Sequence, residues 1–345
     1  MKLQFATRSC RVAAITVVAV VLGASAACSQ DTAADADQTV NDRVVRVASF
    51  SSAQTGWDAT IPDFTSSNAA RLAAGNSATR EVKVEYGASG EVVEKILDGR
   101  PADIAYVTDA DDIADLVKGE AIPANWDNGT IGGLPVNSVV TMVVRAGNPR
   151  GIHDWPDLLQ PGLEVITPNP VNVGSGRWAL LAGYAAASSG DHDPEAGKNY
   201  LRRLILEHIA LGPTTVKQAT DEFVGGRGDV LLLSEASATQ LVRKGFAVEQ
   251  VLPPQTMRMD FAIAITKSGL EKPLASELIQ FMFSPRGQQS WAQAGFRPGS
   301  PVPEPHFPVP QHLWTITDLG GWESVGRRYF GAHGFITNLF KMATQ

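Results

Sequence analysis

Residues 82–97, VKVEYGASGEVVEKIL, decide the fold class. The stretch opens with a β-branched run typical of a strand and closes with apolar residues, including Val92, Val93 and Ile96, on one side of a helix. Small residues join the two parts at 87–90. A strand, a short turn and a helix in succession form the repeating unit of α/β proteins, and this unit predicts that class.

The same alternation runs from residue 44 to the C-terminus. Strands are expected at Val44–Ala48, Val82–Tyr86, Ile104–Val107, Val139–Arg145, Glu164–Thr167, Val230–Leu233 and Phe261–Thr266. Helices are expected at Glu91–Leu97, from near Arg177 and at Leu270–Phe283, and an extended surface loop at Pro298–Pro310. About 300 residues exceed one usual α/β core, which predicts two lobes.

Composition excludes several classes of protein. The chain has 345 residues and a net charge of −7 without a basic tract, which argues against nucleic-acid binding. Both cysteines, Cys10 and Cys28, lie within the first 28 residues, so the rest of the chain has no disulfide and no thiolate nucleophile. The six His form no HExxH motif. We therefore expect neither a metal nor a cofactor.

The first 28 residues predict export. Three positive charges precede the apolar run Val12–Gly23, which is too short to span a bilayer and is followed by ASAAC, ending at Cys28. A Cys after small residues resembles the lipobox of bacterial lipoproteins, in which that Cys is lipidated. Ordinary cleavage near Ala27 is the alternative.

Residues 29–43 are polar and Asp-rich, as in a solvated, flexible tether. Removal of the signal peptide takes away three positive charges and no negative ones, so the net charge changes from −7 to −10. The expected location is the periplasm or cell surface, with a lipid anchor at Cys28.

Four turns between expected strands and helices are rich in small or hydroxyl residues. They are Ser49–Ser52, Tyr86–Gly90, Val173–Gly176 and Thr214–Lys217. The first backbone N–H groups of a helix lack intrahelical partners, and with the helix dipole they can bind an anion without any formal charge. Each turn alone can also be an ordinary helix cap.

Motifs of enzymes are missing. The chain has no GxSxG, no GxxxxGK[ST] and no GxGxxG. An exported hydrolase that uses Ser175 or Ser89 is a second hypothesis, although neither serine has an evident His partner. Arg177 either pairs with an anion or lies on the outside of its helix. An acidic cluster lacks the Gly of an EF-hand loop and is interpreted as a helix start: Asp109, Asp111, Asp112 and Asp115.

Several motifs in order give the chain a family resemblance. Ile166–Pro170, then Gly174 and Arg177-Trp178, resemble the signature of the periplasmic sulfate-binding proteins of ABC importers. Further matching segments are Arg145–Trp155, Gly228–Leu231, Phe283–Gln288 and Gly320–Trp322. The resemblance covers roughly residues 44–343.

The resemblance implies a type II periplasmic-binding-protein fold, in which two α/β lobes close over the ligand. Lobe 1 would comprise 44–140 plus 255–345, and lobe 2 would comprise 141–254. Two crossover strands near Val139–Arg145 and Met257–Ile265 would form the hinge.

The resemblance also implies the anion contacts. The contact positions map to Ser51, Ser89, Gly174, Ser175, Val216 and Ser234, with Gly90, Val173, Gly176, Arg177 and Lys217 in support. Ser89 would offer both its backbone N–H and its hydroxyl. The chain departs from the family at Val173, where the family has Ser, at Ser234, where it has Trp, and at Ser51, where it has Asp.

The implied function is the capture of sulfate or thiosulfate and its delivery to the permease subunits of an ABC importer. The protein would be a monomer without catalytic activity, held at the membrane by its lipid. A two-lobe receptor for molybdate, tungstate or an organic sulfonate is the alternative within this class.

Overall fold

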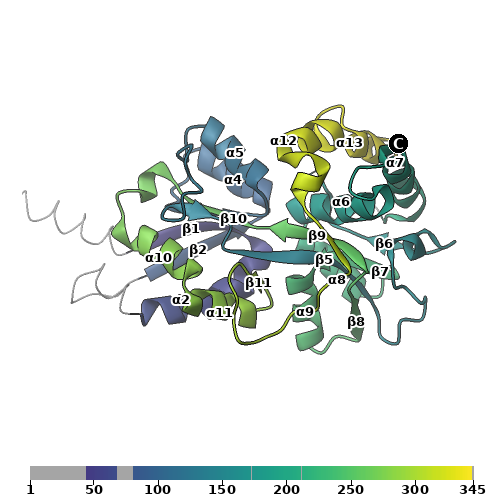
Figure 1. Cartoon of the computed structure of the whole chain (residues 1–345), viewed down its shortest axis with the longest axis horizontal. Helices are drawn as coiled ribbons and strands as arrows, with labels where there is room; N and C mark the ends of the chain where they lie inside the picture. Colours follow the sequence, from purple (N-terminus) through teal and green to yellow (C-terminus); the bar gives the residue numbers. More distant parts are fainter. Residues whose placement is uncertain (1–43, 68–80, 172, 211, 344–345) are drawn as a thin grey trace, which may run out of the picture. The chain divides into compact units, whose positions relative to one another are not determined.

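The computed structural model describes residues 44–67, 81–171, 173–210 and 212–343. The expected signal peptide, tether and lipidation site at Cys28 lie outside these residues. Helices and strands alternate along them, as in an α/β protein (Figure 1).

The first sheet has five strands in the order β2-β1-β3-β10-β4. Their bounds are β1 Val44–Phe50, β2 Glu81–Gly87, β3 Ile104–Val107, β4 Gly132–Gly133 and β10 Ala262–Ile265. β1 pairs in parallel with β2 and β3, whereas β10 is antiparallel to β3 and β4. The parallel strands β1, β2 and β3 therefore end at the same edge of the sheet.

Helices cover both faces of this sheet. They are α2 Gln54–Thr65, α4 Ser89–Leu97, α5 Ala110–Lys118, α10 Pro273–Phe283 and α11 Pro285–Gln293. Figure 1 shows α4 and α5 above the sheet and α2, α10 and α11 below it. The apolar stripe of α4, with Val92, Val93 and Ile96, packs into one core with Ile113 and Leu116 of α5.

The second sheet has seven strands. Their bounds are β5 Val136–Arg145, β6 Val165–Ile166, β7 Val230–Ser234, β8 Val248–Val251, β9 Gln255–Asp260, β11 Arg297–Pro298 and β12 His312–Trp314. The order is β12-β9-β5-β7-β6, and β8 and β11 also pair with β5. β6 is parallel to β7, so both strands end at one edge.

The second sheet is also covered on both faces. Its helices are α6 Gly174–Ser188, α7 Pro194–Arg203, α8 Val216–Val224, α9 Glu235–Arg243, α12 Gly321–Val325 and α13 Phe335–Ala343. Phe223 of α8 and Leu241 of α9 pack against Leu231 and Leu233 of β7. Residues of α6, with Leu180 and the neighbouring apolar side chains, form the core on the other face.

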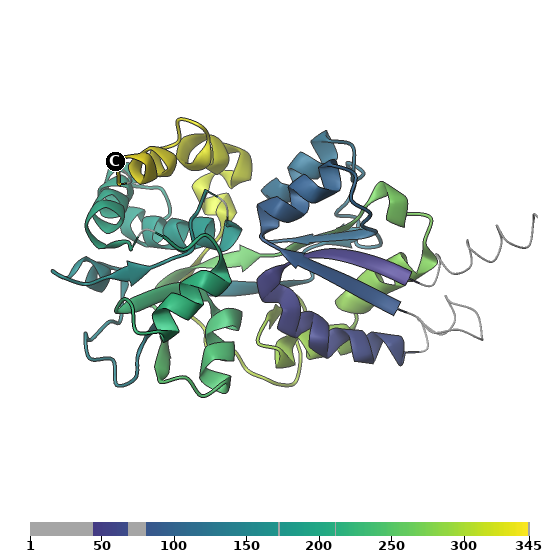
Figure 2. The same cartoon turned by 180° about the vertical axis from the view of Figure 1, so that it is seen from behind.

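Two segments pass from one sheet to the other. β5 begins three residues after β4, and β10 begins two residues after the end of β9. β5 and β9 are antiparallel partners, so both crossings lie side by side (Figure 1). Seen from behind, β1 and β2 run together toward the helices of the second sheet (Figure 2). This is the two-lobe arrangement of type II periplasmic binding proteins.

Every strand expected from the sequence forms, with ends that differ from the expected ones by at most three residues. The three expected helices form as α4, α6 and α10. The segment 299–311 contains no helix or strand, as expected for an extended loop. After this loop the chain returns to the second sheet, where β12 pairs with β9.

Candidate functional site

A cavity of about 360 Å³ lies where the carboxyl ends of β1, β2 and β3 meet the first residues of α6 and α8. Its lining is Phe50, Ser51, Ser52, Gln54, Tyr86, Gly87, Ala88, Ser89, Thr108, Val173, Ser175, Thr215, Val216 and Lys217. All four small-residue turns of the sequence contribute to this lining. The cavity lies beyond the carboxyl ends of β1, β2 and β3, which is where ligand sites of α/β sheets usually lie.

Two of the helices that begin at the cavity have no capping side chain. The residues before them are Ala88 for α4 and Val173 for α6, and their hydrocarbon side chains accept no hydrogen bond from the helix N–H groups. Side-chain oxygens normally satisfy one of the first N–H groups of a helix. At α4 and α6 the first N–H groups and the positive end of the helix dipole instead face a cavity, which suits an anion.

The third helix, α8, differs from the other two because it has a capping side chain, that of Thr215. The Thr215 side chain accepts a hydrogen bond from the backbone N–H of Gln218 at 3.0 Å. That bond leaves the N–H groups of Val216 and Lys217, the first two residues of the helix, without an intrahelical partner.

Ser175 offers a hydroxyl donor at the same place. Ser175 lines the cavity, and its Oγ is buried and has no hydrogen-bond partner among the residues that the structure describes. A buried hydroxyl without a partner costs about 1–3 kcal/mol. Such a cost is offset when a ligand accepts the hydrogen bond.

The hydroxyl of Ser89 is already engaged. Its Oγ accepts a hydrogen bond from the Thr108 backbone N–H at 2.9 Å and donates one to the carboxylate of Asp112. The sequence led us to expect both the hydroxyl and the backbone N–H of Ser89 in the site. In this structure the hydroxyl is directed to Asp112, and the backbone N–H at the start of α4 is the donor on the cavity side.

Gly174 is held where no side chain fits. A Cβ built on it would lie 1.9 Å from Oγ1 of Thr108. The first residues of α6 thus lie directly against the turn that follows β3.

Two buried carboxyl groups lie behind this part of the cavity. Burial, together with the charge of Asp112, raises the pKa of Asp109 to about 8. Burial also raises the pKa of Asp112, while Arg177 and the hydrogen bond from Ser89 oppose that shift. Among the described residues that line the cavity, Lys217 is the one with a formal charge at neutral pH.

Residues 46–297 match the family described as bacterial extracellular solute-binding protein. The chain belongs to this family.

Proteins similar to this solute-binding protein include named sulfate-binding and thiosulfate-binding proteins. The sulfate-binding protein of Synechococcus elongatus is 28% identical over 330 residues, which cover 93% of this chain and 92% of that protein. A thiosulfate-binding protein of Pseudomonas aeruginosa is 27% identical and covers 75% of this chain and 82% of its own length.

Solved structures agree. The sulfate-binding protein SubI from Mycobacterium tuberculosis is 41% identical, with a TM-score of 0.76 over 83% of this chain and 99% of that one. A periplasmic thiamin-binding protein, 15% identical with a TM-score of 0.60, shares the fold. This family consists of binding proteins that act outside the cytoplasm. Among the described residues, no helix is both long and apolar enough to cross a membrane.

The structure separates the predicted site residues into two groups. Ser51, Ser89, Val173, Ser175, Val216 and Lys217 line the cavity of the solute-binding protein. Gly174 lies between two lining residues. Outside the lining lie Gly90, Gly176, Arg177 and Ser234. The Ser234 hydroxyl caps α9, where it accepts a hydrogen bond from the Ser237 N–H at 3.2 Å.

Gln54 and Thr108 are the lining residues that sequence reasoning missed. Thr108 directly follows the expected strand Ile104–Val107, and that position at a strand end is the signal that pointed to the other turns. The acidic cluster was interpreted only as a helix start. Asp109 does cap α5, by accepting from the Asp112 N–H at 3.1 Å, but Asp112 also contacts Ser89.

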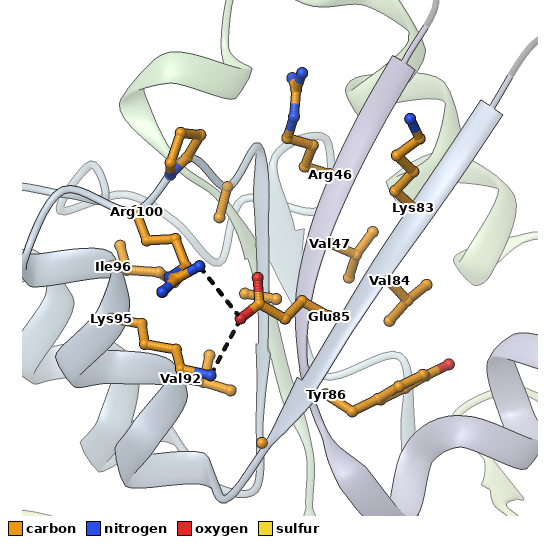
Figure 3. A pocket seen from close by; sticks show the side chains of 14 residues that line it. Arg46, Val47, Lys83, Val84, Glu85, Tyr86, Val92, Lys95, Ile96 and Arg100 are labelled. Carbon is orange, nitrogen blue, oxygen red and sulfur yellow. Dashed lines mark hydrogen bonds and ion pairs between the residues drawn. The ribbon is translucent and has the colours of Figure 1, made fainter.

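A second cavity of about 210 Å³ lies between β2 and α4 (Figure 3). Three of the cations in its lining, Lys83, Lys95 and Arg100, already have carboxylate partners. Glu85 contacts Lys95 at 3.1 Å and Arg100 at 4.0 Å, and Lys83 contacts Glu81 at 3.2 Å. The uncapped helix starts and the unpaired Ser175 hydroxyl favour the first cavity as the anion site.

Proposed function

We propose that this protein captures sulfate, or a related oxyanion such as thiosulfate, in the cavity at the starts of α4, α6 and α8, and delivers it to an ABC importer. The observation that carries the proposal is the convergence of four turns on one cavity, with two uncapped helix starts and the unpaired hydroxyl of Ser175. The names of the relatives support the choice of ligand.

Two backbone carbonyls of the cavity lining already accept hydrogen bonds from the protein. The Gly87 carbonyl accepts from the Ser51 hydroxyl at 2.9 Å, and the Thr108 carbonyl accepts from the Trp178 indole N–H at 2.9 Å. Sulfate at neutral pH only accepts hydrogen bonds, whereas protonated phosphate must also donate one. A site of donors therefore favours sulfate over phosphate, because the phosphate proton would lack a partner.

A hydrolase receives no support from the two candidate serines. The Ser89 hydroxyl is bonded to Thr108 and Asp112, and the Ser175 hydroxyl has no general base beside it within the described residues. Both arrangements favour binding over nucleophilic attack.

We further propose that residues 44–135 and 261–296 form one lobe and residues 136–260 the other, and that the segment from β11 onward joins the second lobe. The pairing of β12 with β9 supports this revision of the expected boundaries. Closure about β5 and β9 would be the signal read by the permease. The protein would act as a monomer tethered through a lipid on Cys28, which the mass of the mature protein would test.

Isothermal titration with sulfate, thiosulfate, phosphate and molybdate tests the function. We expect stoichiometric binding of sulfate or thiosulfate, and binding of phosphate at least tenfold weaker, since an unmade buried hydrogen bond costs about 1–3 kcal/mol. Absence of binding to all four anions would contradict the proposal. Ser276→Ala, on α10 and away from the cavity, is the control variant.

A further inference from the structure

A closed ring of contacts connects the two sheets beside the cavity. Asp112 of α5 accepts a hydrogen bond from the Ser89 hydroxyl, and Ser89 Oγ accepts from the Thr108 N–H at 2.9 Å. The Thr108 carbonyl accepts from the indole N–H of Trp178 at 2.9 Å. The neighbour of Trp178 in α6, Arg177, closes the ring, with Nη1 3.8 Å from Oδ1 of Asp112.

The ring joins elements that are far apart in the sequence. Ser89, Thr108 and Asp112 belong to turns and helices of the first sheet, whereas Arg177 and Trp178 belong to α6, which covers the second. Two of its members, Ser89 and Thr108, line the cavity. The contacts that hold the two sheets together here are therefore the same contacts that orient a residue of the anion site.

Burial makes the ring sensitive to the loss of any one member. The side chains of Asp112 and Arg177 are 7% and 20% exposed. The Arg177 guanidinium also donates through Nε to the Pro170 carbonyl at 3.3 Å and lies 5.8 Å from the ring centre of Phe330. A buried carboxylate near an anion site repels the ligand unless a cation balances it, and Arg177 is positioned to do so.

The packing of α6 against the same turn leaves little freedom. A Cβ on Gly174 would lie 1.9 Å from Thr108 Oγ1 and 3.1 Å from Oδ2 of Asp109. Any movement of α6 away from the turn thus opens the Trp178–Thr108 bond and the Arg177–Asp112 pair together.

We infer that Asp112 and Arg177 form an interlobe latch, and that Asp112 is a positioning residue which turns the Ser89 hydroxyl away from the ligand and presents the start of α4 through its backbone N–H groups. The inference rests on the proposed function for its ligand. The Asp112–Arg177 contact between α5 and α6 is present in the protein without ligand, so it can be tested separately from the proposed function.

The first experiment is a double-mutant cycle in sulfate affinity, with Asp112→Ala, Arg177→Ala and the double variant. We expect each single change to weaken sulfate binding about tenfold and the double change to weaken it no further, because both remove the same pair. Arg177→Lys keeps the charge and should recover part of the affinity. Asp115→Asn, on the exposed side of the same helix, is the matched control and should bind as the wild type does.

Unchanged sulfate affinity in Asp112→Ala, or effects of the two single changes that multiply in the double variant, would overturn the inference. If Asp112→Ala does not fold, Asp112→Asn tests the pair with Arg177 alone, since it keeps the shape and an acceptor for Ser89 but loses the charge that faces Arg177.

The second experiment needs no ligand. With Cys10 and Cys28 changed to Ser the chain has no cysteine, so fluorophores can be attached at Glu94→Cys on α4 and Glu195→Cys on α7, both exposed. We expect a wider distribution of transfer efficiencies in Asp112→Ala and Arg177→Ala than in wild type. If both variants show the wild-type distribution of transfer efficiencies, the inference of an interlobe latch is wrong. If the distribution is wider but the protein binds none of the four anions, only the proposed ligand is wrong.

Discussion

Gly174→Ala tests the close approach of α6 to the turn after β3. The new Cβ would lie 1.9 Å from Thr108 Oγ1 and 3.0 Å from Thr108 Cβ. Rotation of Thr108 relieves the first contact but breaks the 3.3 Å bond from its hydroxyl to Asp109, and leaves the second contact in place. The advantage of alanine over glycine, about 1 kcal/mol, applies to helix interiors, and Gly174 is the first residue of α6, so it offsets overpacking of about 1–3 kcal/mol only in part.

We expect Gly174→Ala to raise the dissociation constant for sulfate about tenfold, since about 1.4 kcal/mol corresponds to one decade. Isothermal titration measures this, and differential scanning fluorimetry reports whether the unliganded protein also loses stability. Thr108→Ala in the same chain removes the nearer of the two contacting atoms and should restore most of the affinity. Wild-type affinity in Gly174→Ala alone would refute the close packing of α6 on the first sheet.

Three further changes test other parts of the site. Ser175→Ala removes an unpaired buried hydroxyl, so sulfate affinity should fall about tenfold in titration while the thermal midpoint without ligand stays equal or rises; a lower midpoint with full affinity would contradict the assignment. Ser89→Pro removes a backbone N–H at the first position of α4, where Pro is tolerated, whereas Ser89→Ala keeps this N–H. We expect Ser89→Pro to bind sulfate at least tenfold more weakly than Ser89→Ala does. Equal affinities would exclude the Ser89 N–H as a donor to the anion. Asp109 has a folded-state pKa of about 8, against about 3.9 in an unfolded chain. Its contribution to the free energy of unfolding is therefore complete below pH 4 and is lost as the pH rises to 8, by up to about 1.4 kcal/mol per pH unit. Asp109→Asn should flatten the dependence of the thermal midpoint on pH across this window, and an unchanged slope would refute the raised pKa.

The fold followed from local patterns because each unit carries its own signal. The stretch 82–97 shows a β-branched strand, a small-residue turn and an amphipathic helix, and it forms β2 and α4 with only a few residues of difference at the ends. The four turns were found in the same way, since the end of a strand and the start of a helix are both visible in the sequence. Their convergence on one cavity depends on strand order, which local patterns do not contain.

Side-chain orientation was the part that the sequence could not supply. The Ser89 hydroxyl was expected to reach the anion, but its direction is decided by Asp112, which is 23 residues away. Ser234 was carried into the site by family resemblance, and here it caps its own helix. In both cases a hydrogen bond within the protein competes with the ligand for the hydroxyl, and that competition depends on tertiary packing.

For the acidic cluster, the sequence predicted the local structure but not the tertiary contacts. Asp109 and Asp112 lie at the start of α5, so the prediction that the acidic cluster begins a helix is correct. Their burial beside Arg177 and Ser89 depends on the approach of α6 from the second sheet.

The most direct test of the account is a crystal structure with selenate, the selenium analogue of sulfate, because anomalous scattering locates the selenium independently of any prior placement. We predict one strong anomalous peak in the cavity, with a selenate oxygen within hydrogen-bond distance of Ser175 Oγ and near the first residues of α4 and α6. A peak in the cavity between β2 and α4, beside Lys83 and Arg100, or no ordered selenate at all, would contradict the account.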